Sequence, residues 1–308
     1  MNRKLRLPLA VILTALPVER REVCTHLLRL AEETHPEGTV YWEGTFPCES
    51  CDWSVKVVEI GPGNPRAAFE TERAISYFKP NVALFVGVAG GIKDVQIGDV
   101  VAARKVYGYE FGKANTIFQP RPEVGNATYR MEQRARAIAS SKDWLKRLKG
   151  RIPVPEPNVY VEAIAAGEQV INSTRSATYE FLRQQYSDAL AVEMEGIGFL
   201  SAAHANQHVN AIIIRGISDL VDGKSEADAT NSQELASRHA SAFAFEILAK
   251  LGNDKKYLAS ATIASSTKKG RKEGLPRNKY SITNNGQMAV GDNAQMTINW
   301  YKYKSPEQ

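Results

Sequence analysis

Cysteine is scarce in this chain, with only three in 308 residues. Three cysteines cannot form a disulfide framework, so the sequence predicts a protein of a reducing, cytoplasmic compartment. Cys48 and Cys51 form one CxxC pair, but no second pair follows to complete a structural zinc site, and we interpret the pair as a hairpin turn. His204 and His208 stand four residues apart without a third ligand. We therefore expect no metal and no cofactor.

Long apolar runs are also missing, since no stretch approaches the roughly 20 apolar residues that cross a bilayer. The N-terminus resembles a signal peptide, because three basic residues precede an apolar run from Leu7 to Leu16. No convincing small-x-small cleavage site follows, and the run also has the length of a buried strand bounded by Pro17. We expect a first strand here and no membrane partner.

Positive charge is unevenly distributed along the chain. The formal net charge is +5, with a pI near 9.0. From Asn253 onward, ten Lys and Arg stand against four Asp and Glu, so this part carries +6 and the rest of the chain −1. A basic tail is more often a solvated linker than a polynucleotide site, so we expect no nucleic-acid partner.

Apolar strand-like runs alternate with amphipathic helical segments over residues 1–251. This alternation is typical of an α/β fold, a three-layer αβα sandwich with a mixed, largely parallel central sheet. Strands are expected at Leu9–Leu16, Trp53–Ile60, Val82–Gly87, Asp99–Tyr107, Val159–Ala166 and Asn210–Gly216. Helices are expected at Val18–Glu33, Arg66–Phe78, Glu132–Leu148, Thr174–Gln184, Glu195–Asn206 and Ser232–Leu251.

The composition divides the chain into three parts. Residues 1–251 are the expected catalytic domain, and residues 252–279, rich in Ser, Thr, Lys and Gly, are an expected flexible basic linker. Residues 280–308 alternate apolar and polar side chains around NNG and GDN, which predicts a short β-prone motif of two or three strands. Such a motif is too small to fold stably by itself.

Four segments place chemically useful residues at strand ends. VILTALPVERREV delivers Glu19, LFVGVAGGIKDVQIGDVV runs into a glycine-rich bend, AVEMEG holds Glu193 and Glu195, and IIIRGISDLVDG ends at Asp219. In open α/β sheets the carboxyl ends of strands line the ligand crevice, and glycines let a ligand approach the backbone. Singly, each acid is more often a helix cap or a partner of a helix dipole. Jointly, three carboxylates around one bend predict a catalytic pocket.

The motifs VGVAGGI…IGDVV, AVEME and RGISD, in this order and spacing, resemble those of the bacterial 5'-methylthioadenosine/S-adenosylhomocysteine nucleosidases, within the purine nucleoside and uridine phosphorylase superfamily. The resemblance runs from about Leu9 to Leu251. It implies a nucleoside phosphorylase-like fold and an N-glycosidase activity that releases adenine. It also implies a homodimer or a higher homo-oligomer.

The resemblance also implies residue roles. Asp219 would protonate purine N7 with Ser218 orienting it, Glu19 would activate the attacking water, and Glu195 would bind the ribose hydroxyls with Met194 packing against the sugar. Val170 and Ile171 fall where the family lines the base pocket, with valine in place of the usual aromatic residue. The remaining substrate-binding residues are those of the bend, Val88, Ala89 and Gly90, together with Arg215, which would supply a water contact that Val88 lacks.

The chemistry of an N-glycosidic bond agrees with these roles. Breaking C1'–N9 builds positive charge on the sugar and negative charge on the purine, which calls for an acid at the base and carboxylates near the sugar. Two carboxyls with separate roles need different environments, with Asp219 protonated and Glu19 ionised.

Water is the expected nucleophile. Phosphorylases of this superfamily hold phosphate with an arginine before the glycine bend and a hydroxyl inside it, where this chain has Phe85 and Val88. A dianion would be poorly compensated there. A phosphate-dependent purine nucleoside phosphorylase remains the alternative, with Arg66 or Arg104 reaching the site from elsewhere.

The segment ARKVYGYEFGKAN contains Arg104, Lys105, Tyr107, Tyr109 and Lys113. It resembles nucleosidase-like effectors of bacterial conflict systems, some of which act on ATP or related nucleotides. One hypothesis is therefore a substrate with 5'-phosphates. Alternating cations on a strand are equally typical of its solvent face.

In the tail, QMAVGDNAQM resembles RHIM-related amyloid signalling motifs, through Met288, Val290, Gly291 and the pair Asp292–Asn293. Short β-prone segments of this kind template strands across chains. This implies an effector of bacterial antiphage defence, recruited by an NLR-type NTPase. The plain alternative for the tail is a hairpin that docks on the enzyme or closes an oligomer. The protein would then be a housekeeping nucleosidase. A third class, a nucleotide-binding adaptor assembling through this motif, is disfavoured by the full carboxylate set.

Overall fold

The computed structural model of the chain describes residues 7–148, 153–221, 231–254, 282–284 and 287–289. The first three ranges belong to one compact unit within Met1–Ser265, and the last two to a second within Ser266–Gln308. In the described residues, no helix has both the length and the apolar character needed to cross a membrane.

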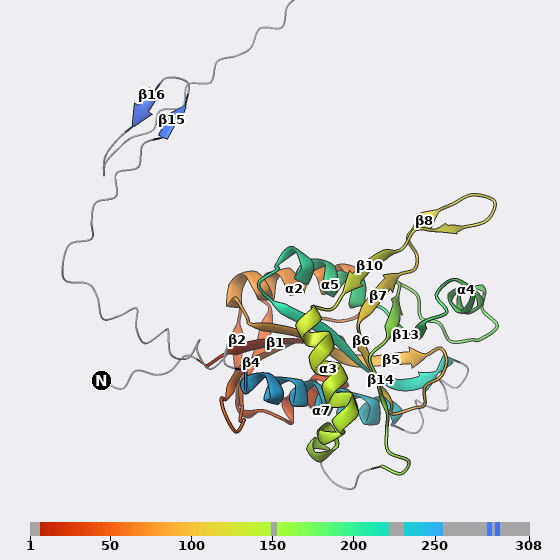
Figure 1. Cartoon of the computed structure of the whole chain (residues 1–308), viewed down its shortest axis with the longest axis horizontal. Coiled ribbons are helices and arrows are strands. Elements are labelled where there is room, and N and C mark those ends of the chain that lie inside the picture. Colours follow the sequence, from red (N-terminus) through yellow and green to blue (C-terminus); the bar gives the residue numbers. More distant parts are fainter. Residues whose placement is uncertain (1–6, 149–152, 222–230, 255–281, 285–286, 290–308) are drawn as a thin grey trace, which may run out of the picture. The chain divides into compact units, whose positions relative to one another are not determined.

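A twelve-stranded mixed sheet forms the middle of the first unit (Figure 1). Its strands are β1 (Leu9–Thr14), β2 (Leu28–Thr34), β3 (Val40–Phe46), β4 (Trp53–Glu59), β5 (Val82–Gly91), β6 (Val100–Ala103), β7 (Lys105–Gly108), β10 (Glu123–Asn126), β11 (Val159–Tyr160), β12 (Ala163–Ala166), β13 (Ala189–Glu193) and β14 (Asn210–Leu220). The main path runs β10-β7-β12-β13-β5-β1-β4-β3-β2, with β14 pairing β5 and β6, and β11 pairing β6. The central strands β1, β4, β5 and β14 pair in parallel, while β2, β3 and β10 add antiparallel edges.

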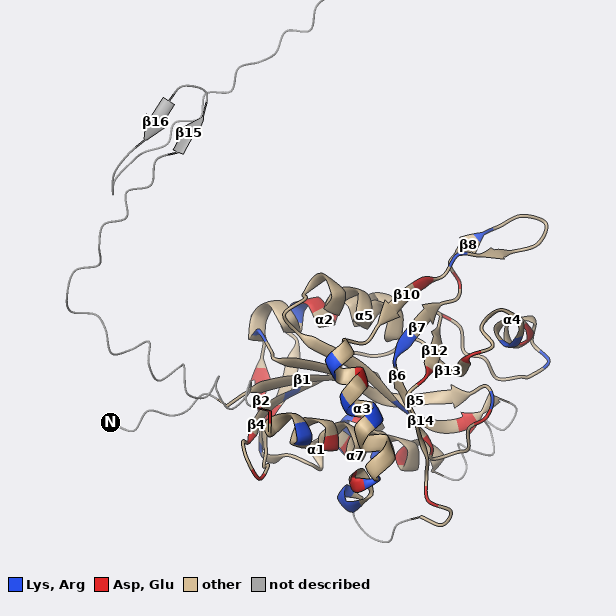
Figure 2. Ribbon diagram, in the orientation of Figure 1, with Lys and Arg blue, Asp and Glu red and all other residues tan. Residues whose placement is uncertain are grey.

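Helices cover both faces of this sheet. They are α1 (Pro17–Cys24), α2 (Asn64–Phe78), α3 (Tyr129–Ser141), the 3₁₀ helix η1 (Asp143–Arg147), α4 (Ala177–Gln185), α5 (Gly196–Ala205) and α7 (Ser232–Gly252). Helices α2 and α5 pack together on one face, and α1, α3 and η1 pack against α7 on the other (Figure 1). Figure 2 shows basic and acidic residues interspersed along α3.

Two apolar cores lie on opposite sides of the sheet because successive side chains of a strand point to opposite faces. In β1, Ile12 packs in the core that holds Phe243 of α7, whereas Leu13 packs in the core that holds Phe199 of α5. Strands covered on both sides need apolar side chains at every position, which explains their continuous apolar runs. The predicted three-layer αβα sandwich with a mixed, largely parallel sheet is confirmed.

Several element predictions were wrong in detail. The helix predicted at Val18–Glu33 ends at Cys24, and the rest of that segment turns into the edge strand β2. Its sequence LRLAEET is rich in helix-favouring Leu, Ala and Glu, but antiparallel pairing with β3 overrides that propensity. Strands β3 and β13 were not predicted. The strand predicted at Asp99–Tyr107 is two strands, β6 and β7, and the one at Asn210–Gly216 continues to Leu220.

Other predictions concern the cysteine pair and the C-terminal part of the chain. Cys48 and Cys51 are free and lie between antiparallel β3 and β4, as the hairpin interpretation predicts. Most of the predicted linker, residues 255–279, lies outside the described residues. In the tail, β15 (Ile282–Asn284) and β16 (Gln287–Ala289) pair antiparallel, and the signalling-like motif beyond Ala289 lies outside the described residues.

Candidate active site

A pocket of about 310 Å³ lies at the carboxyl ends of β1, β5, β13 and β14. Strands β1, β5 and β14 run parallel and so end at the same edge of the sheet, and β13 pairs antiparallel with the last residues of β5. The lining residues are Ala15, Leu16, Glu19, Pro62, Val88, Ala89, Gly90, Gln169, Val170, Ile171, Val192, Glu193, Met194, Glu195, Ser218, Asp219 and Gln233.

A larger cleft of about 550 Å³ lies elsewhere, beside the end of α7. Four of its charged groups form ion pairs, Arg147 with Glu246 and Lys250 with Asp143. None of the acids predicted for catalysis lines this cleft. Size therefore does not identify the candidate site here, whereas the grouping of carboxyls does.

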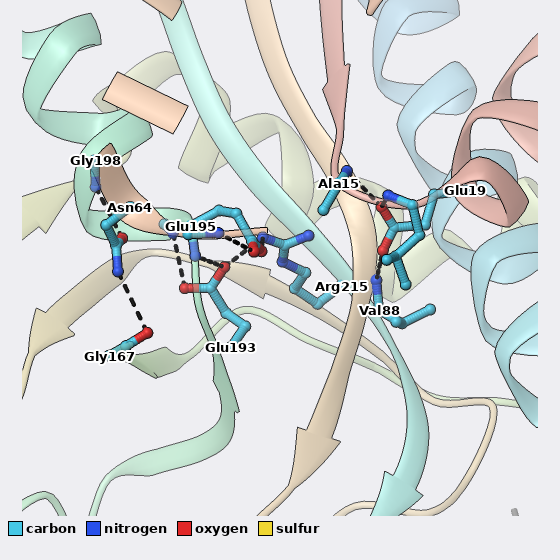
Figure 3. Close-up of polar contacts among 12 residues, drawn as sticks. Ala15, Glu19, Asn64, Val88, Gly167, Glu193, Glu195, Gly198 and Arg215 are labelled. Atoms are coloured by element: carbon cyan, nitrogen blue, oxygen red, sulfur yellow. Dashed lines mark hydrogen bonds and ion pairs between the residues drawn. The ribbon is translucent and has the colours of Figure 1, made fainter. Parts of the chain in front are cut away.

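Glu19 is the third residue of α1, and its side chain folds back over the start of that helix. Its Oε2 accepts hydrogen bonds from the N–H groups of Ala15 (2.7 Å) and Leu16 (2.9 Å), as the acid of a capping box does. Its Oε1 accepts the N–H of Val88 at 2.8 Å, which ties the helix to the bend of β5 (Figure 3). Burial raises the pKa of Glu19, while Arg215 and the three N–H groups act to lower it. The predicted ionised state of Glu19 is thus opposed by burial and favoured by these partners.

Arg215 lies beneath the pocket in the middle of β14, fully buried, rather than on the pocket wall. Its Nη2 donates to Glu193 and to Glu195 Oε2, the latter at 2.9 Å, and its guanidinium lies 4.5 Å from the centre of the Phe85 ring. A buried cation is tolerated when carboxylates pair with it in this way. Arg215 therefore binds side chains of the site, and its predicted water contact stays a prediction.

Glu193 is a site residue to which sequence reasoning gave no role. Besides Arg215, it accepts hydrogen bonds from the N–H groups of Glu195 (3.1 Å) and Gly196 (2.8 Å), at the start of α5. A carboxylate is stabilised at a helix N-terminus by the unpaired N–H groups and the dipole. The AVEME motif contains this glutamate, but its two backbone hydrogen bonds form because α5 begins at Gly196.

Glu195 combines burial with three charged neighbours. Its Oε1 accepts the N–H of Gly63 at 3.0 Å. Burial is the main cause that raises the pKa of Glu195 to about 7, with Glu193 and Glu19 adding to it, against the lowering effects of Arg215 and the Gly63 N–H. A carboxyl with this pKa changes its charge near neutral pH.

Ser218 and Asp219 are both buried at the end of β14, where the pairing with β5 shifts between Ile217 and Asp219. Ser218 Oγ donates to Asp219 Oδ2 at 2.8 Å. Asp219 stands opposite Gly90, and a Cβ placed on that glycine would lie 3.3 Å from Asp219 Oδ1. The short serine thus orients the carboxyl toward the bend.

The glycine bend leaves space for side chains of the site as well as for a ligand. A Cβ on Gly87 would overlap both Arg215 Nη1 and Glu19 Oε1. Glycine at this position leaves room for both side chains beside the strand. This requirement is steric, and no left-handed backbone conformation is involved.

Every predicted site residue except Arg215 lines the one pocket: Glu19, Val88, Ala89, Gly90, Val170, Ile171, Met194, Glu195, Ser218 and Asp219. Of the two base-pocket residues, Ile171 is buried and Val170 is 58% exposed. Sequence reasoning missed Pro62 and Gln169, which lie in connections between elements, and Gln233, which is the second residue of α7. The catalytic roles themselves stay predictions.

The cations considered for phosphate binding lie elsewhere. Arg104 pairs with Glu162 (3.1 Å), and Lys105 pairs with Asp188 (2.8 Å), at the amino end of β7 and away from the pocket edge. Neither Arg66 nor any other Lys or Arg lines the pocket among the residues that the structure describes. The solvent-face interpretation of Arg104 and Lys105 is favoured. Within the same described part of the chain, no cluster of His, Cys, Asp and Glu is suited to a metal ion.

Comparison with known proteins places this geometry in a family. Residues 10–251 match the family model described as the phosphorylase superfamily. The chain is 29% identical over 241 residues to the ATP nucleosidase Cap17 of Escherichia coli, covering 71% of this chain and 47% of that protein. It is 25% identical over 185 residues to a 5'-methylthioadenosine/S-adenosylhomocysteine nucleosidase of Staphylococcus aureus, covering 57% and 72%. The chain thus spans about half the length of Cap17.

Solved structures show the same fold. A Helicobacter pylori 5'-methylthioadenosine/S-adenosylhomocysteine nucleosidase superposes with a TM-score of 0.65 at 20% identity, covering 79% of this chain and 99% of that one. The futalosine hydrolase of Helicobacter pylori superposes with a TM-score of 0.63 at 20% identity, covering 84% and 98%. With the family model matched over most of its length, this chain belongs to the phosphorylase superfamily.

Proposed function

We propose that this chain hydrolyses the N-glycosidic bond of an adenine nucleoside or nucleotide and releases adenine. The observation that carries the proposal is the meeting of Glu19, Glu195 and Asp219 in one pocket beside the bend of β5. The names of the relatives, an ATP nucleosidase and a methylthioadenosine nucleosidase, support the same reaction class.

The geometry supplies a group for each part of the reaction. Ser218 occupies Oδ2 of Asp219, which leaves Oδ1 to deliver a proton to the purine as the bond to the sugar breaks. Glu195 and Met194 face the sugar, where a carboxylate stabilises the positive charge that develops on the ring. Glu19, held by three N–H groups, takes the proton of the attacking water.

Water is favoured over phosphate as the nucleophile. Four carboxyl residues line the pocket, and Arg215 already donates to two of them. A phosphate dianion would therefore enter a negatively charged site with no free cation among the described lining residues. A phosphorylase remains the second candidate, because the chain belongs to a superfamily named for that activity.

The 5' side of the substrate and the cellular role rest on the relatives and on sequence resemblance. The likeness to an ATP nucleosidase favours a nucleotide, whereas the described pocket lining offers no Lys or Arg for its phosphates. Assembly as a dimer, recruitment by an NLR-type NTPase and a role in defence rest on sequence resemblance. The tail motif behind the last two lies mostly outside the described residues.

The test is release of free adenine by the purified full-length chain from ATP, AMP and methylthioadenosine, each with and without phosphate. Asp219→Asn should lower the rate by about 10²- to 10⁴-fold, the usual contribution of a general acid. Asp188→Asn is the matched control, because Asp188 is an ion-paired aspartate outside the pocket. Strict dependence on phosphate would establish a phosphorylase instead, and no adenine from any substrate would refute the proposal.

A further inference from the structure

A short connection, residues 60–63, joins β4 to α2 beside the pocket. Gly63 has a φ of +113°, a conformation that side-chain-bearing residues rarely adopt. This conformation places its N–H against Glu195 Oε1 at 3.0 Å. The next residue, Asn64, begins α2 and is buried, with 8% of its surface exposed.

The side chain of Asn64 joins two other elements (Figure 3). Its Oδ1 accepts the N–H of Gly198 at 3.1 Å, in the first turn of α5. Its Nδ2 donates to Glu168 Oε1 (2.9 Å) and to the carbonyl of Gly167 (3.4 Å), and its backbone N–H also donates to Glu168 Oε1 (3.2 Å). Residue 198 must be glycine because the Asn64 carbonyl occupies the place of a Cβ.

The two elements joined by Asn64 carry different parts of the pocket. Helix α5 follows directly on Glu195, and Gly167 and Glu168 lead into the pocket-lining residues 169–171. Asparagine suits this position because one short side chain offers both an acceptor, for the helix N–H, and a donor, for the carboxylate. Aspartate has no such donor and would oppose Glu168 with a like charge.

We propose that Asn64 is a positioning residue that holds the loop 167–171 in register with the carboxylate of Glu195, and thereby sets the affinity of the site for its nucleoside. Asn64 does not line the pocket, so it acts through these two elements and not on the substrate. The expected effect on substrate affinity rests on the proposed function. The expected effect on the position of residues 167–171 rests on the hydrogen bonds alone.

The experiment compares Asn64→Asp with Asn64→Asp combined with Glu168→Gln, and the single Glu168→Gln variant completes the cycle. We expect Asn64→Asp to raise KM about tenfold, with kcat changing less than threefold, because it keeps the acceptor for Gly198 but frees the loop. In the double variant the glutamine amide can donate to the new carboxylate, so KM should return to within about threefold of the wild type. Asn206→Asp is the matched control, since Asn206 donates to Glu72 on the surface and its replacement should leave KM unchanged.

Hydrogen exchange of the amides in residues 167–171 provides a readout without substrate. Exchange should be faster in Asn64→Asp and restored in the double variant. Unchanged KM and exchange in a folded Asn64→Asp protein would overturn the inference, and so would a loss that the double variant does not recover. If the wild type releases no base, the proposed function fails, and the exchange measurement alone decides whether Asn64 holds the loop.

Discussion

Arg215 offers a sharp test of how the candidate site is held together, because it is fully buried and donates to both Glu193 and Glu195. In Arg215→Met an unbranched apolar side chain fills part of the space of the arginine beside Phe85, while the positive charge and its cation–π contact are removed. The variant leaves two buried carboxyls facing each other without a cation. Removing one partner of a buried ion pair costs about 3–5 kcal/mol, a large part of a usual free energy of unfolding of about 5–15 kcal/mol.

The matched control is Arg104→Met. Arg104 pairs with Glu162 at 3.1 Å, but the two side chains are 32% and 41% exposed. Exposed ion pairs contribute about 0–1 kcal/mol, so this loss should be several-fold smaller. Urea unfolding of both variants, followed by tryptophan fluorescence, gives the two differences in free energy of unfolding on one scale.

The pH dependence separates electrostatics from packing. Arg215 lowers the pKa values of Glu195 and Glu19, so its removal raises the folded-state pKa of each acid further above the unfolded value. An acid with a raised folded-state pKa contributes stability below its unfolded pKa and loses that contribution as the pH rises through the folded pKa. The cost of Arg215→Met should therefore be larger at pH 8 than at pH 5.5. Equal costs for both arginine variants, or a cost independent of pH, would refute this account of the site.

Three other measurements address the pocket. Gly87→Ala should lower kcat/KM for base release at least tenfold, because the added methyl group overlaps Arg215 and Glu19; wild-type activity would show that the two side chains can move apart at little cost. The kcat/KM should rise with pH through an apparent pKa near 7, because the role proposed for Glu195, stabilising the developing sugar cation, requires its ionised form; a flat profile from pH 5.5 to 8.5 would contradict that role. Arg104→Met should leave the KM ratio of ATP to methylthioadenosine unchanged, since Arg104 is ion-paired away from the pocket; a selective rise for ATP would revive the phosphate-binding hypothesis.

The layers of the fold could be predicted because the central strands contain continuous apolar runs, as at residues 82–86 in β5 and residues 211–214 in β14. The same signal fails at the edge of the sheet. In β2 most side chains are exposed, so its sequence shows no apolar run, and only pairing with β3 makes it a strand. Strand β13 is five residues long, and its sequence ALAVE reads equally well as helix.

The candidate site divides in a similar way. Acids at the ends of parallel strands, such as Glu19 and Asp219, could be placed together because parallel strands end at one edge of a sheet. The positions of Asn64 and Pro62 beside the site could not be predicted, because the contacts of a turn with distant segments depend on the folded chain and leave no local pattern in the sequence. Arg215 was predicted at the end of its strand but lies in the middle of β14, and its burial and its bonds to two carboxyls were not predictable from one strand.

The excess of carboxyl groups over cations has a chemical consequence. Four acidic side chains line the pocket, and Arg215 is the one cation among the described residues that pairs with them, so a further negative charge is unfavourable. Burial, with Glu193 and Glu19 adding to it, raises the pKa of Glu195 to about 7. A positive charge that forms on a sugar ring in this pocket reverses the balance, because it favours the ionised form of every neighbouring carboxyl. The site is then more complementary to a cationic transition state than to a neutral substrate, which is the condition for catalysis. A neutral water molecule can attack the sugar cation without adding charge to the pocket. A phosphate dianion would instead bring further negative charge next to the four carboxyl groups.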